Sequence, residues 1–230
     1  MIGFVDVYIE SGSKRVFACS QEWPGLCRSG RDEAQALQAL AAYMSRYADV
    51  AAEAGVPFPA STGDDLKVVE KVAGSASTDF GVPGAQAKDD AEAMDREEAE
   101  RLTTLLEASW RVFDRIVAAA PAVLRKGPRG GGRDRDKIVD HVLGAEVGYA
   151  SKMGLRLRAP EAHDGVAVSE FRRAISERLS RASDGGALAE RLAGALCLPP
   201  NRLARPRPCL GDSGSGPDPM RVGPRASRTT

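Results

Sequence analysis

The sequence predicts an α+β protein, in which a small antiparallel sheet with one packed helix is followed by an all-α, incomplete four-helix bundle domain. Three observations lead to this prediction. In residues 1–74, apolar and polar residues alternate at the period of strands around one helical stretch. Within residues 95–190, three stretches repeat apolar residues at the helical period. In residues 191–230 the chain is rich in Pro, Gly, Ser and Arg and has no period, which predicts a disordered tail.

The first 74 residues predict three strands, a helix and a fourth strand. Residues 5–9 alternate between apolar and polar side chains, and a turn at residues 11–14 leads into a second strand, RVFACS. The stretch LCRSG predicts a third strand, and LKVVEKVAG predicts a fourth. Between them Asp32 caps a helix that ends near Gly55, and Gln35 completes a capping-box pattern.

Residues 75–94 predict a linker, because Gly, Ser, Ala and Asp are frequent there without a sustained period. The next domain begins with a long amphipathic helix that ends at Pro121, and a third helix runs from about Ser169 to Asp184. Between these two, a second helix begins at Asp134 or Asp136. Its expected apolar face consists of Ile138, His141, Val142, Ala145, Tyr149 and Met153. Three helices of this kind leave apolar faces that a fourth would cover.

The stretch WPGLCRSGRDEAQALQAL resembles the pattern of HicB-like proteins, with a Pro-Gly turn, a short strand, a Gly and a helix that opens on an acidic residue. The resemblance implies the sheet-and-helix fold of HicB antitoxins, a ribonuclease-H-like fold without its catalytic carboxylates. In this chain Asp6, Glu10 and Glu22 are scattered and do not pair for metal-dependent hydrolysis. One hypothesis is therefore a non-enzymatic, antitoxin-type module that binds a protein partner through an exposed edge strand of the sheet.

The stretch RDKIVDHVLGAEVGYASKMG resembles the second helix of the DinB-like superfamily of four-helix bundles. The resemblance implies a divalent metal, Zn or Ni, held by one histidine on helix two, here His141, and by an H-x-x-x-H pair on helix four. Some members are thiol-dependent transferases or isomerases. This chain has two histidines, and His163 falls in a loop, so the triad cannot form. We expect a catalytically impaired copy, without catalytic residues, that binds no metal.

Two explanations are open for the absent fourth helix. If the reading frame shifts by one base at Leu192, the permitted codons can give WPARYAFRRIAWHVLDHAWEIQDR, an amphipathic helix that contains H-x-x-x-H. Its histidines would come from the Ala204/Arg205 and Pro208/Cys209 junctions. The alternative is a natural disordered tail, which the Pro, Gly and Arg content also predicts. The nucleotide sequence around Leu192 distinguishes them.

Composition limits the partners. Lys+Arg 32 balances Asp+Glu 32, so no overall field attracts nucleic acid, and we expect no nucleic-acid partner. The N-terminal residues lack the pattern of a leader, and no apolar run approaches the ~20 residues that span a membrane. We therefore expect a cytoplasmic protein without a membrane partner. The sequence sets no oligomeric state.

Two further features have competing interpretations. In the glycine-rich loop Arg129, Arg133 and Arg135 could hold an anion, or the loop could be a solvated connection. A weaker hypothesis is that this loop and the tail bind RNA or DNA. The four cysteines are widely spaced in the sequence and form no CxxC, so we expect them to be buried or incidental thiols.

Overall fold

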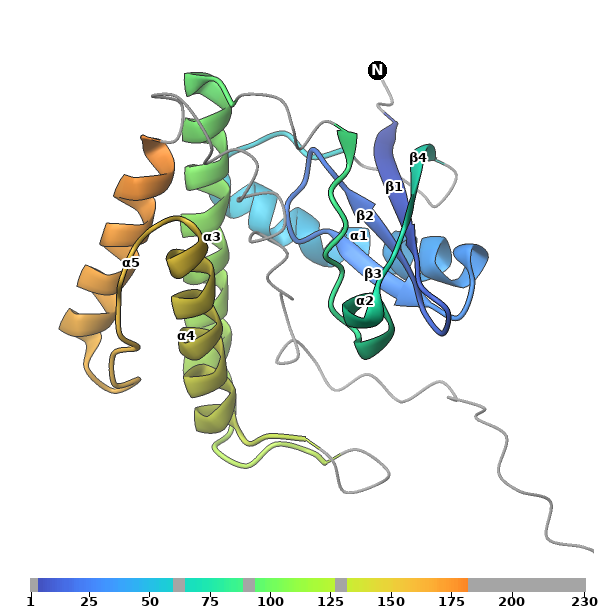
Figure 1. The fold of residues 1–230 in the computed structure, drawn as a ribbon. Coiled ribbons are helices and arrows are strands. Elements are labelled where there is room, and N and C mark those ends of the chain that lie inside the picture. Colours follow the sequence, from blue (N-terminus) through green and yellow to red (C-terminus); the bar gives the residue numbers. More distant parts are fainter. Residues whose placement is uncertain (1–3, 60–64, 89–93, 127–131, 182–230) are drawn as a thin grey trace, which may run out of the picture.

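The computed structural model describes residues 4–59, 65–88, 94–126 and 132–181. It has a four-stranded mixed sheet and helices, with the helices concentrated in the C-terminal part (Figure 1), so the predicted α+β fold class is confirmed. The elements, in chain order, are β1 Val5–Ser11, β2 Val16–Ser20, β3 Cys27–Gly30, α1 Glu33–Ala54, β4 Leu66–Ala73, α2 Ala76–Phe80, α3 Arg96–Ala119, α4 Arg135–Lys152 and α5 Gly165–Ser180.

The sheet has the strand order β3-β2-β1-β4. The first three strands pair antiparallel, as predicted. The fourth strand pairs parallel to β1, which corrects the expectation of an all-antiparallel sheet. The physical reason is the connection: α1 carries the chain back across the sheet, so β4 starts from the same end as β1, and a helix is the usual link before a parallel strand. A bulge at Val69 interrupts the β1–β4 register.

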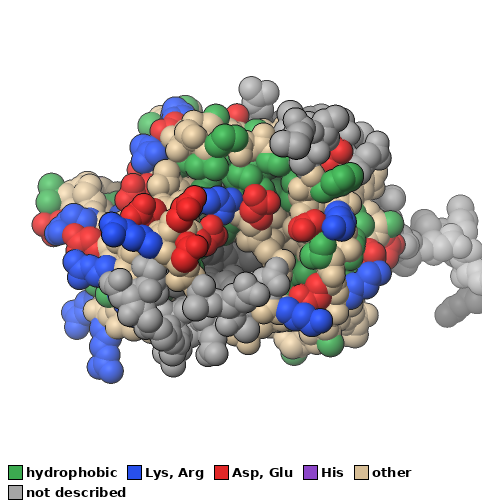
Figure 2. Space-filling view, turned by 90° about the horizontal axis from the view of Figure 1, so that it is seen from above, with side chains coloured by type: hydrophobic (Ala, Val, Ile, Leu, Met, Phe, Trp, Pro, Cys, Tyr) green, Lys and Arg blue, Asp and Glu red, His purple; other side chains and the backbone are tan. Residues whose placement is uncertain are grey.

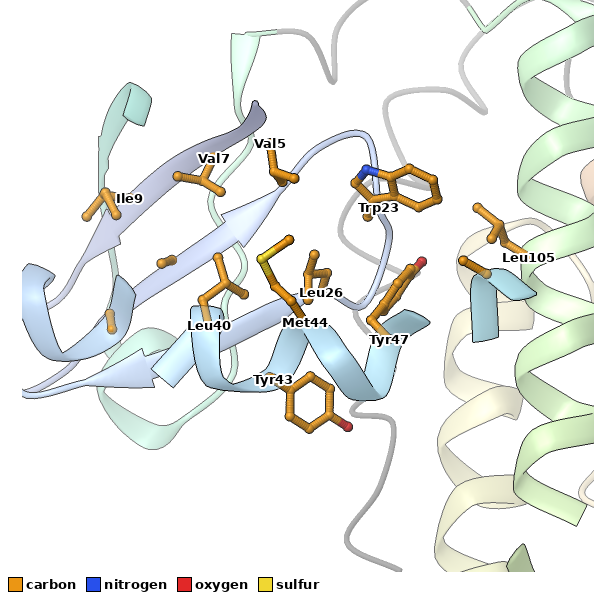
Figure 3. Packing of buried hydrophobic residues seen from close by; sticks show 13 residues of the cluster. Val5, Val7, Ile9, Trp23, Leu26, Leu40, Tyr43, Met44, Tyr47 and Leu105 are labelled. Carbon is orange, nitrogen blue, oxygen red and sulfur yellow. The ribbon is translucent and has the colours of Figure 1, made fainter. Parts of the chain in front are cut away.

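Helix α1 covers one face of the sheet and forms the main core with it (Figure 3). The Asp32 side chain accepts a hydrogen bond from the backbone N–H of Gln35 at 2.8 Å, which confirms the predicted cap. The Gln35 amide accepts from the backbone N–H of Arg31, not of Asp32, so the capping box is only approximate. The core side chains labelled in Figure 3 are Val5, Val7, Ile9, Trp23, Leu26, Leu40, Tyr43, Met44, Tyr47 and Leu105.

The opposite face of the sheet is covered by part of the segment that we expected to be a linker. Helix α2 begins at the cap residue Ser75, and the chain after it brings Ala87 into a cluster with Tyr8, Phe17 and Cys19. Residues 89–93 lie outside the described residues. The described part of the stretch 75–94 therefore belongs to the packed sheet layer.

The three long helices share one apolar cluster, and their directions follow from contacts at their ends. The Arg135 guanidinium donates to the carbonyl of Ala120, so α4 begins where α3 ends and runs antiparallel to it. Arg178 of α5 donates to the carbonyl of Met153, at the end of α4, so α4 and α5 run parallel. The connection between them returns along the bundle (Figure 1), as in bundles with a crossover connection. Helix α5 begins four residues before the predicted Ser169.

Helix α3 also packs against α1 (Figure 1). Leu105 is buried in the core of the sheet half, and a second small cluster joins Val50 of α1 to Ala108 and Val112 of α3. At the surface, the Glu53 carboxylate accepts hydrogen bonds from two arginines of α3, Arg111 and Arg115. The sheet half and the helical half thus share buried contacts. The predicted domain boundaries stay a prediction.

The C-terminal tail and the possibility of a membrane-spanning helix are the remaining predictions. The tail, with the disorder and the frameshift that we expect there, lies outside the described residues, which end at Arg181. Within the described ranges, no helix is long and apolar enough to cross a membrane.

Candidate functional site

The predicted metal ligand His141 is exposed on α4, so its expected place on the apolar face is wrong. The buried residues of this helix are Leu143, Glu146 and Ala150, a face rotated by one residue step, about 100°. On this face Leu143 and Ala150 pack in the apolar cluster of the three long helices, and Glu146 accepts a hydrogen bond from the indole N–H of Trp110. His163 is also exposed. In the described parts of the chain, no group of three or more His, Cys, Asp or Glu residues could hold a metal ion.

The three arginines predicted to hold an anion are not brought together. Arg129 lies outside the described residues, and Arg133 is exposed. Arg135 binds the Ala120 carbonyl at 3.0 Å and the Asp136 carboxylate at 2.8 Å, so its guanidinium ties α4 to the end of α3. A cation at the carboxyl end of a helix also stabilises the helix dipole. On the face in Figure 2, Lys and Arg side chains lie interspersed with Asp and Glu.

The centre of the helical half holds a buried carboxylate that the sequence analysis did not identify. Glu146 of α4 is 3% exposed, and its Oε1 accepts a hydrogen bond from Nε1 of Trp110 on α3 at 2.8 Å. Its Oε2 is buried and has no hydrogen-bond partner among the described residues. Burial raises the pKa of Glu146 above its usual value, and the nearby Arg172 guanidinium and the Trp110 hydrogen bond partly oppose this shift.

Arg172 of α5 lies beside Glu146 and Trp110, so the polar contacts at this site involve all three long helices. Its two terminal nitrogens donate to the Asp114 carboxylate of α3 at 2.6 and 3.1 Å, a bidentate pair. Its guanidinium carbon lies 5.3 Å from the centre of the Trp110 ring, within the range of a cation–π contact. Its Nε is buried and unpartnered among the described residues. The Arg172 side chain is 12% exposed and the Asp114 side chain is 57% exposed, so this ion pair connects the buried Trp110 and Glu146 to the surface.

A groove of about 500 Å³ runs between α3 and α5 beside this ion pair. Side chains of both charges and several hydroxyls line it, among them Glu107, Trp110, Asp114, Arg172, Arg173 and Ser176. Such a lining could bind a small polar molecule that carries both charges. The acids and arginines that it presents are largely paired with each other, so nothing in the lining is arranged as a nucleophile with its base.

A second buried carboxylate, Glu10 of β1, lies on the sheet face opposite α1. It accepts hydrogen bonds from the Thr78 hydroxyl and from the backbone N–H groups of Gly84 and Ala85, the latter two at 2.9 and 3.0 Å. Its side chain is fully buried. Glu10 therefore fixes the segment after α2 on the sheet and is occupied in a structural role. The sequence analysis treated it only as one of several scattered acids.

The expectation that the cysteines are buried or incidental thiols is wrong for two of them. Cys19 of β2 and Cys27 of β3 are register partners in adjacent antiparallel strands, and they form a disulfide with a Cα–Cα distance of 4.1 Å. The sequence separation is 8 residues, and the loop 21–26 brings β3 back alongside β2 so that the two cysteines face each other. The other two cysteines, Cys197 and Cys209, lie outside the described residues.

The outer edge of β4 is the longest open strand edge in the described sheet. Strand β4 has 8 residues and pairs only with β1 among the described strands. Lys67, Val69 and Lys71 are exposed along it, and Val69 occupies the bulge. No family model, no curated protein and no solved structure matches the chain.

Proposed function

We propose that this chain is a non-enzymatic protein-interaction protein. Its N-terminal part is a HicB-like module that binds an extended segment of a partner protein along the outer edge of β4. Its helical part is DinB-like and descends from metal-binding bundles, but in this copy it holds no functional metal site. The observation that carries the proposal is the open edge of β4 in an otherwise packed sheet.

The local structure of β4 supports a selective partner. An open strand edge offers unpaired backbone donors and acceptors to an incoming strand. Exposed lysines and a bulge are devices that prevent indiscriminate pairing between edges, and β4 has both, with Lys67, Lys71 and the bulge at Val69. Lys71 pairs with Glu33 at 2.6 Å, so an extended segment with acidic side chains would overcome this protection mainly by complementing the charge of Lys67.

The binding proposal is tested with a library of random extended peptides displayed on phage and selected on the full chain. We expect enriched sequences to alternate β-branched and acidic residues, and the synthetic peptides to bind the full chain in a titration. Lys67→Glu should weaken this binding about tenfold or more, because a like charge then faces the acidic peptide. The matched variant Lys137→Glu, on the exposed side of α4, should bind as the wild type does. Binding that ignores Lys67→Glu would contradict the proposal.

The three long helices share one apolar cluster, as expected of a helical bundle, and this supports the DinB-like descent of the helical part. Helix α3 is antiparallel to α4, α4 is parallel to α5, and a crossover connection joins the last two. The side chains present do not fit the three-histidine site that the resemblance implies, because His141 is exposed and lies in no ligand group of the described residues. Any thiol-dependent transferase activity of the ancestor is therefore expected to be lost in this copy.

The metal proposal is tested by calorimetric titration of the full chain with Zn²⁺ and with Ni²⁺. The wild-type protein and the His141→Ala variant should give the same weak binding, and His163→Ala serves as the matched control. Stoichiometric binding of either ion that disappears only in His141→Ala would overturn the assignment of an impaired copy.

A further inference from the structure

We propose that Cys19 and Cys27 form a reversible thiol–disulfide site that controls how firmly the β2–β3 loop docks on α3. Nothing in the proposed function requires this pair. The proposal rests on the position of the two cysteines and on what lies between them in the chain.

The two cysteines differ in their accessibility. Cys19 is 1% exposed and belongs to the cluster that Tyr8, Phe17 and Ala87 form on the outer face of the sheet. Cys27 lies on the edge strand β3 and is half-buried. Cys27 is therefore the more accessible residue of the pair, although it also packs against this cluster, and we infer that an external thiol attacks its sulfur with Cys19 as the leaving group.

The loop between the cysteines is the part of the sheet half that contacts the start of α3. The Arg101 side chain donates to the carbonyl of Glu22 at 2.7 Å, and its guanidinium carbon lies 4.8 Å from the centre of the Trp23 ring. Trp23 is 2% exposed and packs at 5.9 Å from the Tyr47 ring, and Tyr47 donates to the Pro24 carbonyl at 2.9 Å. The disulfide thus closes the base of a loop whose tip is the contact with α3.

The chemistry is ordinary thiol–disulfide exchange with a small thiol such as glutathione. A glutathione thiolate attacks Sγ of Cys27, the disulfide breaks, and Cys19 leaves as a thiolate that takes up a proton. A second glutathione thiolate attacks the glutathione sulfur of the mixed disulfide and releases Cys27. Two glutathione molecules become one glutathione disulfide, and the protein gains two electrons and two protons. Oxidation by glutathione disulfide is the reverse.

Reduction should loosen the docking contact, because the covalent link at the base of the loop is then lost and the pairing of β2 with a four-residue edge strand depends on backbone hydrogen bonds. Local opening of such a strand has a low free-energy cost. When β3 frays, Trp23 and Glu22 no longer hold a fixed position against Arg101. In the oxidised state the covalent link prevents this fraying.

The site is tested on the full chain with Cys197→Ser and Cys209→Ser, which leaves the proposed pair as its only cysteines. The protein is equilibrated in glutathione buffers of varied ratio, alkylated and digested with trypsin. Both cysteines fall in the tryptic peptide 16–28, whose mass reports the disulfide directly. We expect a reversible transition with the buffer ratio. With a further Cys19→Ser substitution, glutathione should accumulate on Cys27, whereas the matched Cys27→Ser protein should remain unmodified at Cys19.

The control of docking is tested by hydrogen exchange of the same protein in both states. Reduction should accelerate amide exchange of the loop 20–26 and of the first turns of α3 about tenfold, while α5 stays unchanged. In buffer without glutathione disulfide, the Cys19→Ser variant should exchange as the reduced protein does. The proposal fails if the pair forms no disulfide in glutathione buffers, or if α3 exchanges equally fast in both states.

Discussion

Among the described residues two glutamates are buried, and they differ in how well their oxygens are satisfied. Glu10 accepts three hydrogen bonds, two of them from backbone N–H groups. Glu146 accepts one from Trp110, and its second oxygen is without a partner among the described residues. A buried carboxylate is stable when hydrogen bonds replace its hydration, so Glu10 should stabilise the fold and ionised Glu146 should cost stability.

Replacing Glu10 should test whether its carboxylate stabilises the fold. Glu10→Ala leaves the buried Thr78 hydroxyl and two partly buried backbone N–H groups without this acceptor, and we expect a loss of about 2 kcal/mol in the free energy of unfolding, measured by urea denaturation. The matched control is Glu33→Ala, because the Glu33 carboxylate makes a surface ion pair with Lys71, and its removal should cost less than about 1 kcal/mol. Equal losses in the two variants would show that the Glu10 hydrogen bonds do not hold the segment after α2.

The pH dependence of unfolding should test whether ionised Glu146 lowers the stability of the fold. Burial raises the pKa of Glu146 above its usual 4.5 in the folded protein, so the folded state binds this proton more tightly than the unfolded state. The contribution of Glu146 to stability is therefore fully present below pH 4.5 and is lost as the pH rises through the folded pKa. Wild type and Glu146→Gln are compared by urea denaturation across this range, and the wild type should lose stability relative to the variant as pH rises. Parallel curves would contradict the assignment.

The sequence could not predict the burial of these two glutamates because neither belongs to a motif. Glu10 alternates correctly with its apolar neighbours, and its burial arises from a segment more than 60 residues later in the chain, through Thr78. The Cys19–Cys27 pair could not be predicted for a related reason. Strand register decides which residues face each other, and sequence spacing does not.

At the scale of single elements, the local signals of the chain were informative. The alternation in residues 5–9, the Asp32 cap and the left-handed Gly55 after α1 placed these elements correctly. What local signals do not contain is orientation. The direction of β4 depends on how α1 crosses the sheet, and the buried face of α4 depends on how this helix packs against α3 and α5. His141 was assigned inward for lack of that information.

The cap of α1 gives an element-scale prediction. Asp32→Ala removes the acceptor for the Gln35 backbone N–H, and we expect a loss of about 1 kcal/mol in the free energy of unfolding. Asp32→Asn keeps an oxygen at the same place and should lose less than half of that amount. Chemical denaturation of both variants checks the order, and an Asn variant as unstable as the Ala variant would rule out capping as the cause.

At the scale of the whole molecule, the sequence predicted two units joined by a linker, and the structure adds contacts between them that no sequence period could indicate. Leu105 lies in the apolar stripe of α3, so its burial was predictable, but its partners in the sheet half were not. The Arg101 contacts with Glu22 and the Glu53 contacts with Arg111 and Arg115 surround it. We infer that the two halves unfold as one cooperative unit.

Native-state hydrogen exchange of Leu105→Ala in the full chain tests this inference most directly. Truncating a buried leucine should cost about 3 kcal/mol, and if the halves are one unit, the protection of α1 and of α3 should fall together by that amount. Val166→Ala, at a position 72% exposed, is the matched control and should change neither helix. If α3 loses protection while α1 keeps that of the wild type, the halves are independent and the shared interface does not hold them together.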